Sequence, residues 1–223
     1  MNSHIVITMR RDFGAEGHEI GAQLAERLGI AFYDKDILGK AAYKKGIDEA
    51  SFSQADESVT KTYVDPVFPS RGFTRKSDQL FALEKEFIRD VAATKSCVIV
   101  GRLSAYILRN NTNVFNILIT APFDFRVKNI QEKYHSSLSD AKKLVKHVDA
   151  MRRDYRNYYS NGKWQLYEKR GLMLNREVFD IPSCVEILET AVKVMKKQCL
   201  KEALRGFVWV GFLVRVNKSI KIS

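Results

Sequence analysis

The 223 residues of the chain suit one domain, with or without a lid and an insertion, and are enough to bury a real core. Apolar residues make up 45% and charged residues 28% of the chain, which excludes a disordered or fibrous protein. The formal charge of +11 favours polyanionic partners such as nucleotides, nucleic acid or acidic membrane surfaces, and it does not choose among them.

Cysteine usage and the two ends of the chain indicate the compartment. The three cysteines match neither a disulfide framework nor a zinc site, which favours a reducing environment. The N-terminal residues lack the basic region and the cleavage site of a secretion signal. The apolar run at 207–214 is too short to span a bilayer. We therefore expect a cytoplasmic protein without a membrane partner.

The first part of the chain predicts two strands, each followed by a helix. An apolar, β-branched run at 5–9 predicts a buried first strand, and apolar residues at helical spacing, stopped by Gly29, predict the helix after it. Residues 31–33 predict a second strand, and Asp36 is placed to cap the next helix. Residues 47–78 follow neither period and predict an irregular or loosely helical insertion at the edge of the domain.

The rest of the chain continues this alternation of strands and helices. Strands are predicted at 97–101, 114–121 and 172–174. Helices are predicted at 80–91, 103–109, 122–130, 139–159 and 182–195. The alternation predicts an α/β fold with a parallel sheet of about five strands and helices on both faces. The β-like tail at 207–222 has no place in such a core.

The turn between the first strand and the first helix is a candidate phosphate site. Backbone N–H groups and the helix dipole converge there, and Gly14 and Gly17 allow the positive φ angles and close backbone approach that a phosphate cradle needs. The full phosphate-loop signature has Gly-Lys-Ser or Gly-Lys-Thr where this chain has Gly17-His18-Glu19. The pattern alone therefore leaves phosphate binding and ordinary turn chemistry both open.

Several motifs in a fixed order make a more specific pattern than the loop alone. The loop supplies Arg11, Phe13, Gly14, Gly17, Glu19, Ile20 and Gly21, and the motifs Leu-Ala-Glu-Arg-Leu-Gly and Phe-Tyr-Asp follow at 24–29 and 32–34. Further matches lie at 98–102, Arg126, 148–149, 152–153, 158–159, Trp164 and 172–175. Over roughly residues 4–195 the chain thereby resembles the cytidylate kinase-like family of P-loop nucleoside monophosphate kinases.

The resemblance implies a domain organisation. It implies the three-layer P-loop NTPase fold, with a kinase domain over residues 1–200. Residues 47–78 would form an acceptor-side insertion, and about 136–165 would form a lid that closes to exclude water. An exposed charged helix is the plainer interpretation of the lid. Residues 201–223 would be an extension of unclear role.

The resemblance also implies an activity and a set of site residues. The reaction would be transfer of the γ-phosphate of ATP, bound with Mg²⁺, to CMP, dCMP or a related small acceptor. Nucleic acid is not expected as a partner, and the oligomeric state stays open. The candidates are, for ATP phosphates, Arg11, Phe13, Gly14, Ala15, Glu16, Gly17, His18 and Glu19; for catalysis, Arg126, Arg152, Arg153 and Arg156; and for the acceptor, Asp34, Lys40 and Arg102. Asp34 is equally suited to cap a helix.

Three departures from the family pattern leave other functions open. His18 stands where the family has Arg, and it is largely neutral at pH 7 unless an anion raises its pKa. Glu19 stands where ordinary loops have the Ser or Thr that binds magnesium, and its carboxylate could bind the metal or repel phosphate. Leu103 follows Arg102 where we expect Asp in cytidylate kinases. The alternatives are a kinase for another small metabolite and a catalytically silent nucleotide- or nucleic-acid-binding protein. The remaining histidines lack metal-ligand spacing, so no metal site is predicted.

Overall fold

The computed structural model describes residues 4–37, 75–163 and 171–197. The chain divides by its internal contacts into two compact units, Met1–Val185 and Glu186–Ser223, and the division falls within a helix at 181–197. Lys40, Trp164, the tail at 201–223 and residues 47–74 of the expected insertion lie outside the described residues. No helix in the described ranges combines the length and the apolar character that crossing a membrane requires.

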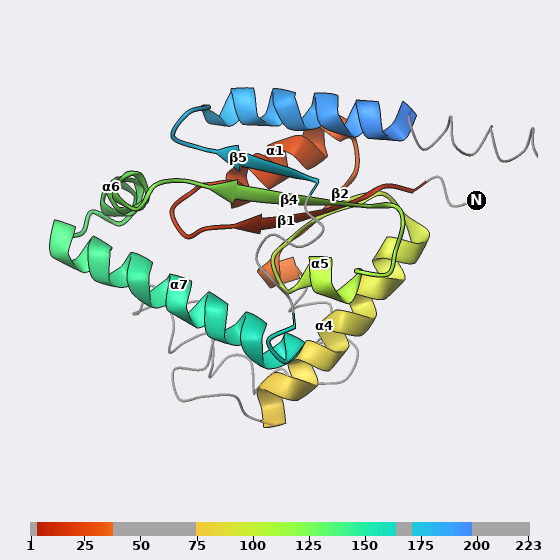
Figure 1. The fold of residues 1–223 in the computed structure, drawn as a ribbon, viewed down its shortest axis with the longest axis horizontal. Helices are drawn as coiled ribbons and strands as arrows, with labels where there is room; N and C mark the ends of the chain where they lie inside the picture. Colours follow the sequence, from red (N-terminus) through yellow and green to blue (C-terminus); the bar gives the residue numbers. More distant parts are fainter. Residues whose placement is uncertain (1–3, 38–74, 164–170, 198–223) are drawn as a thin grey trace, which may run out of the picture. The chain divides into compact units, whose positions relative to one another are not determined.

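A parallel sheet is the centre of the first unit (Figure 1). In the described part of the chain it has five strands in the order β2-β3-β1-β4-β5. Their bounds are β1 Val6–Arg11, β2 Ala31–Tyr33, β3 Cys97–Val100, β4 Val114–Thr120 and β5 Leu172–Asn175. All neighbouring pairs run parallel, which confirms the predicted fold class. Strand β1 has β3 on one side and β4 on the other, so the order of the strands switches direction at β1. Ligands of such sheets bind at the carboxyl ends of the strands near this switch point.

Helices cover both faces of the sheet because the buried strands alternate their side chains between them. Helix α1 (Gly17–Leu28) packs over Met9 and Val100, close enough that a Cβ at Gly21 would lie 2.9 Å from the Val100 side chain. On the other face, β1 and β3 form an apolar cluster with α4 (Arg75–Thr94) and α5 (Ser104–Ile107). Figure 1 shows α1 on one side of the sheet and α4 and α5 on the other.

Two further helices lie at the carboxyl edge of the sheet. Helix α6 (Phe123–Tyr134) and helix α7 (Leu138–Ser160) pack together through a small apolar cluster that also includes Phe13 of the loop after β1. At its other end α7 contacts α4, where the rings of Tyr159 and Phe81 stack with centroids 4.0 Å apart. Helix α7 therefore connects the loop after β1 with the helix that precedes β3.

Several boundaries differ from the predicted ones for local reasons. Strand β1 extends to Arg11, because β4 pairs with it as far as Ile119. Helix α5 spans Ser104–Ile107 and begins after the predicted residue 103, since Leu103 is left-handed with a φ of 54° and cannot be part of a right-handed helix. Helix α7 is capped by Ser137, whose Oγ accepts the Asp140 N–H at 3.1 Å, so it starts before the predicted residue 139.

Candidate functional site

The turn between β1 and α1 has the geometry of a phosphate cradle. Gly14 has a φ of 82°, and a Cβ there would lie 2.7 Å from the Arg126 carbonyl oxygen. A Cβ at Gly17 would lie 2.5 Å from Cβ of Arg11. Gly17 is therefore needed because the start of α1 lies very close to the end of β1, and not because of a positive φ. The second left-handed residue of the turn is Glu16, with a φ of 55°. The first N–H groups of α1 have no acceptor within the helix, and they open toward the turn.

A buried ion pair holds this loop in place. The Nη1 atom of Arg126 donates to the Phe13 carbonyl oxygen at 3.0 Å and lies 2.7 Å from Oδ2 of Asp149. The other oxygen of Asp149 accepts the Phe13 N–H at 3.3 Å. The two side chains thereby hold Phe13 by its carbonyl and its amide, and Nε of Arg126 donates to the Ala121 carbonyl at 3.0 Å. Arg126 thus positions the loop.

A cavity of about 690 Å³, the loop cleft, lies over this turn. Its volume is within the range of ligand pockets in proteins. It is lined by Arg11, Asp12, Phe13, Gly14, Glu16, Gly17, His18, Glu19, Lys35, Asn129, Ile130, Glu132, Lys133, Tyr134, Val148 and Arg152. Ala15 is fully buried below the loop and does not line the cleft.

His18 faces an acid at the end of β2. Its Nε2 lies 2.9 Å from Oδ2 of Asp34, and this hydrogen bond raises the pKa of His18 against the opposing effect of burial. The same bond lowers the pKa of Asp34 to about 2. Oδ1 of Asp34 also accepts the N–H groups of Asp36 and Ile37, each at 3.0 Å. Asp34 therefore caps the helix that follows β2 and pairs with the loop histidine.

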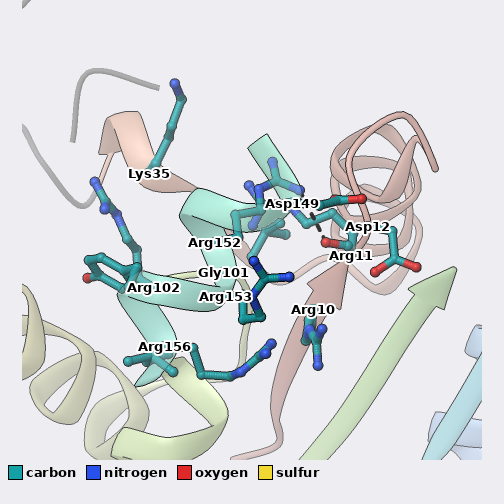
Figure 2. A pocket seen from close by; sticks show the side chains of 13 residues that line it. Arg10, Arg11, Asp12, Lys35, Gly101, Arg102, Asp149, Arg152, Arg153 and Arg156 are labelled. Atoms are coloured by element: carbon teal, nitrogen blue, oxygen red, sulfur yellow. Dashed lines mark hydrogen bonds between the residues drawn. The ribbon is translucent and has the colours of Figure 1, made fainter. Parts of the chain in front are cut away.

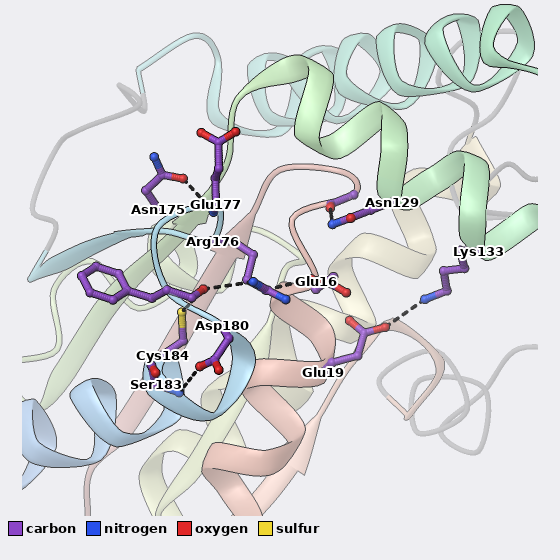
Figure 3. Close-up of polar contacts among 12 residues, drawn as sticks. Glu16, Glu19, Asn129, Lys133, Asn175, Arg176, Glu177, Asp180, Ser183 and Cys184 are labelled. Carbon is purple, nitrogen blue, oxygen red and sulfur yellow. Dashed lines mark hydrogen bonds and ion pairs between the residues drawn. The ribbon is translucent and has the colours of Figure 1, made fainter.

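The two acidic residues of the loop also pair with cations from other elements (Figure 3). Glu16 lies 2.8 Å from Nε of Arg176, which follows β5, and Glu19 lies 2.9 Å from Nζ of Lys133 in α6. Burial is the largest single effect and acts to raise the pKa of Glu19, but the hydrogen bond with Lys133, a backbone hydrogen bond and the charges of Lys133 and His18 together lower it. Glu16 and Glu19 therefore each have a cationic partner from another element.

A second cavity of about 270 Å³, the arginine pocket, adjoins the loop cleft at the carboxyl ends of β1 and β3. Seven basic and two acidic residues line it among those described, and they leave a formal surplus of five positive charges. These residues are Arg10, Arg11, Lys35, Arg102, Arg152, Arg153 and Arg156, with Asp12 and Asp149 (Figure 2). Burial, together with the neighbouring Arg153, lowers the pKa of Arg156. Such a surplus favours an anionic ligand.

The two cavities meet at residues that line both. These are Arg11, Asp12, Lys35 and Arg152. Nη1 of Arg152 donates to the Arg11 carbonyl oxygen at 3.2 Å, so α7 is fastened to the end of β1 at this point. A ligand in the loop cleft and one in the arginine pocket would come closest to each other over these four side chains.

Arg102 lies at the inner wall of the arginine pocket. Its Nη2 is 3.2 Å from Oε1 of Glu84 in α4, and both side chains are almost completely buried. The backbone there is left-handed over three successive residues, with φ of 83° at Gly101, 53° at Arg102 and 54° at Leu103. Non-glycine residues in this region are strained and are typical of functional sites.

The structure brings most of the predicted site residues together in two groups. Arg102, Arg152, Arg153 and Arg156 line the arginine pocket, and the predicted loop residues other than Ala15 line the loop cleft. Arg126 lines neither cavity, because it lies under the loop. Asp34 lies beside His18 and does not line either cavity.

Sequence reasoning missed several residues of these cavities. Lys35 directly follows Asp34 at the carboxyl end of β2, so its position in the chain was a usable signal. Asn129 and Lys133 follow Arg126 by three and seven residues and so share its helix face, which was a second signal. Asp12 directly follows β1, and its Oδ2 accepts a hydrogen bond from the Thr120 hydroxyl at 2.5 Å.

Solved structures share this fold. A crystal structure of an uncharacterized protein from Eubacterium ventriosum is 23% identical with a TM-score of 0.66, over 85% of this chain and 99% of that one. A gluconokinase from Sinorhizobium meliloti is 8% identical with a TM-score of 0.56, over 91% and 99%. A shikimate kinase from Bacteroides thetaiotaomicron is 14% identical with a TM-score of 0.50, over 85% and 98%. These likenesses and the loop after β1 define a protein with the P-loop kinase fold.

A family model gives the more specific assignment. The model of the cytidylate kinase-like family matches residues 6–178. The chain belongs to the cytidylate kinase-like family, as the order of its motifs predicted. No curated protein matches the sequence.

Proposed function

We propose that this protein is an ATP-dependent kinase that transfers the γ-phosphate of ATP to CMP, dCMP or a related small anionic acceptor. The nucleotide triphosphate would lie in the loop cleft on the amides between Gly14 and His18, and the acceptor would lie in the arginine pocket. The observation that carries the proposal is that these two cavities adjoin and share Arg11, Asp12, Lys35 and Arg152. Phosphoryl transfer needs donor and acceptor in contact across such a boundary.

The charges of the site suit the transfer step. Catalysis of phosphoryl transfer consists mainly of positioning and of neutralising the charge on the transferred group. Arg152, Arg153 and Arg156 project from α7 into the arginine pocket, where planar guanidinium groups bind phosphate oxygens well. Arg126 acts one step away, as a positioning residue that holds the loop. Helix α7 would be the lid, with the predicted lid region at 136–165 around it.

The carboxylates of the loop cleft fit a Mg²⁺ ion that arrives with the nucleotide. Magnesium in kinases is held by one or two carboxylates together with phosphate oxygens, and Asp12 and Glu19 both line the cleft. No group of three or more His, Cys, Asp or Glu side chains among the described residues is arranged to hold a metal by itself. When bound, Mg²⁺ would neutralise charge on the triphosphate.

A coupled ADP-release assay across CMP, dCMP, UMP, AMP and GMP tests the proposal, with shikimate and gluconate as further acceptors. We expect turnover with a pyrimidine monophosphate and less with shikimate or gluconate, because the arginine pocket has a surplus of positive charge and a phosphate monoester carries more negative charge than a single carboxylate. Turnover with gluconate or shikimate alone would support a kinase activity but would show that the acceptor is not a nucleoside monophosphate. No turnover with any acceptor, together with nucleotide binding, would contradict the kinase assignment.

A silent nucleotide-binding protein is the second candidate function. The observation that favours it is that His18 and Glu19, at the positions of the customary loop lysine and magnesium ligand, are both engaged with other side chains. Binding of ATP without turnover would support this function. Salt-dependent binding of RNA or DNA, measured beside the kinase assay, would identify a nucleic-acid-binding protein instead.

A further inference from the structure

The phosphate loop lacks its customary lysine, and the residue in that position is engaged elsewhere. His18 directs Nε2 to Asp34 at 2.9 Å, and its ring meets Phe32 edge to face with centroids 5.4 Å apart. A short imidazole held in this way is a poor substitute for a mobile ammonium group that reaches the terminal phosphates of a nucleotide. Binding of those phosphates therefore depends on the other cations that line the loop cleft among the described residues, which are Arg11, Lys35, Lys133 and Arg152.

One face of α6 lies along the loop and offers such a cation. Arg126 donates to the Phe13 carbonyl oxygen at 3.0 Å, Asn129 Nδ2 donates to the Gly14 carbonyl oxygen at 3.0 Å, and Lys133 Nζ lies 2.9 Å from Oε1 of Glu19. These three residues are spaced three and four positions apart, which is the spacing of one helix face. Helix α6 is therefore fixed against the loop, and Lys133 lines the loop cleft and pairs with Glu19 (Figure 3).

We propose that Lys133 supplies, from helix α6, the phosphate-binding cation that the loop itself lacks. In the structure Glu19 pairs with the Lys133 ammonium group near the N-terminus of α1. A bound triphosphate would replace Glu19 as the partner of this ammonium group. The proposal rests on the proposed function, because it needs a nucleotide on the loop. It adds a binding role for a residue that lies 115 positions after His18 in the chain.

The contacts of Lys133 suit an exchange of partners. The side chains of Lys133 and Glu19 are 58% and 36% exposed, so their ion pair is of the weak, solvent-screened kind. A triphosphate carries more negative charge than one carboxylate and would also receive the N–H groups at the start of α1. The other acidic side chain of the loop, Glu16, is held by Arg176 at 2.8 Å. Lys133 can therefore leave Glu19 at little cost.

Equilibrium titration with a non-hydrolysable ATP analogue tests the role of Lys133. We expect Lys133→Met to weaken binding by about tenfold to a hundredfold, the usual effect of losing a hydrogen bond between charged groups. Lys128→Met is the matched control, because Lys128 is on the same helix, is 74% exposed and has an ion pair with Glu132 at 4.0 Å. Binding by the control should stay within about twofold of the wild type. The loss should persist with inorganic tripolyphosphate, which has no base or ribose.

Two double variants separate phosphate binding from simple neutralisation of Glu19. If Lys133 only compensates the carboxylate, Glu19→Gln combined with Lys133→Met will bind like the wild type, and the proposal is overturned. If Lys133 binds phosphate, that double variant will stay weak, whereas His18→Lys combined with Lys133→Met will regain affinity because it restores the lysine to the loop.

The same titration distinguishes failure of this proposal from failure of the proposed function. A wild-type protein that binds the analogue while Lys133→Met binds equally well overturns the role of Lys133 alone. A wild-type protein that binds neither the analogue nor tripolyphosphate overturns the proposed function and this inference together. Unfolding curves of each variant verify that the fold is retained.

Discussion

At the scale of single residues, the pair of His18 and Asp34 puts a titratable group in the phosphate loop. A lysine there would stay charged throughout the physiological range, whereas histidine changes its charge near neutrality. The hydrogen bond with Asp34 and the nearby Glu19 raise the pKa of His18 above 6.5, while burial and Arg11 oppose them. Nucleotide binding should therefore carry a pH dependence that ordinary phosphate loops lack.

The expected result is a loss of affinity for the ATP analogue as pH rises through the raised pKa of His18. Protonated His18 adds a positive charge beside the phosphates, and that charge is lost on deprotonation. The measurement is titration at a series of pH values above 6.5 for the wild type and His18→Asn. Comparing the two proteins at each pH cancels the effect of protonation of the ATP analogue itself. If the affinities of the wild type and His18→Asn change with pH in the same way, the charge of His18 has no role in binding.

The same pair has a signed effect on stability. Since the pKa of His18 is raised in the folded state, its contribution to the free energy of unfolding is complete below pH 6.5. This contribution is lost as the pH rises through the folded-state pKa. Since the pKa of Asp34 is lowered from 3.8 to about 2, its contribution is present above 3.8 and is lost as pH falls toward 2. Because the His18 side chain is half exposed, we expect less than about 1 kcal/mol in total.

Arg102 combines a place in the arginine pocket with a structural ion pair, so its replacement needs a matched design. Arg102→Ala leaves the carboxylate of Glu84 buried without this counter-ion, which should cost about 3–5 kcal/mol of unfolding free energy. Replacing both residues by apolar ones, as in Arg102→Met with Glu84→Leu, should restore most of that stability. Denaturant unfolding measures the first effect.

Acceptor titration of the same double variant tests the function of Arg102. If Arg102 binds the acceptor, the restored fold will still bind CMP weakly and will bind the ATP analogue normally. Normal CMP affinity in the stable double variant would remove Arg102 from the site and leave it a purely structural role.

At the scale of elements, α6 and α7 shape the loop through Arg126 and Asp149. We expect Arg126→Met to lower the unfolding free energy by about 3 kcal/mol, at the lower end for broken buried pairs because Asp149 is 33% exposed. It should also weaken ATP binding, since Phe13 loses the donor to its carbonyl oxygen. Denaturant unfolding and nucleotide titration measure the two effects.

Arg153→Met is the control for Arg126. The Arg153 side chain is 60% exposed and lies 3.8 Å from Asp154, so its loss should change stability by less than about 0.5 kcal/mol. If Arg153 contacts the transferred phosphoryl group, turnover will fall although the fold is intact. Equal unfolding curves for the two variants would contradict the positioning role of Arg126.

The strands and most helices could be predicted from the sequence because their signals are local. Apolar runs at 5–9 and 97–101 are short and rich in β-branched residues, as buried strands are, and the glycines at 14 and 17 indicate the turn after the first of them. The helix predicted at 103–109 exists as α5 but is limited to Ser104–Ile107, and the apolar period of the sequence does not indicate the left-handed backbone at Arg102 and Leu103 before it.

The partners within the site could not be predicted, because they join residues far apart in the chain. Glu19 meets Lys133 across 114 positions, and Phe13 meets Asp149 across 136. A single sequence gives residue types and local periods but no distances between such segments. Arg126 illustrates this, since an arginine after the fourth strand suits both phosphate binding and a buried clamp, and only the position of Asp149 distinguishes them.

At the scale of the whole molecule, the loop cleft and the arginine pocket lie within one compact unit, Met1–Val185. The described cysteines, Cys97 and Cys184, are free and buried there, and burial raises the pKa of Cys97 to about 11. Thiols of this kind are inert. The cytoplasmic location stays a prediction from the sequence.

The proposed kinase function depends on one physical condition: the amides between Gly14 and His18 bind the phosphates of a nucleotide although the loop has no lysine. A crystal structure of the protein with Mg²⁺ and a non-hydrolysable ATP analogue tests it most directly. We expect the triphosphate to bind to these amides. We also expect the Lys133 side chain to have left Glu19 and to contact the triphosphate, with the arginine pocket accessible next to it. An empty loop, with the triphosphate bound elsewhere or not at all, would contradict the proposed function.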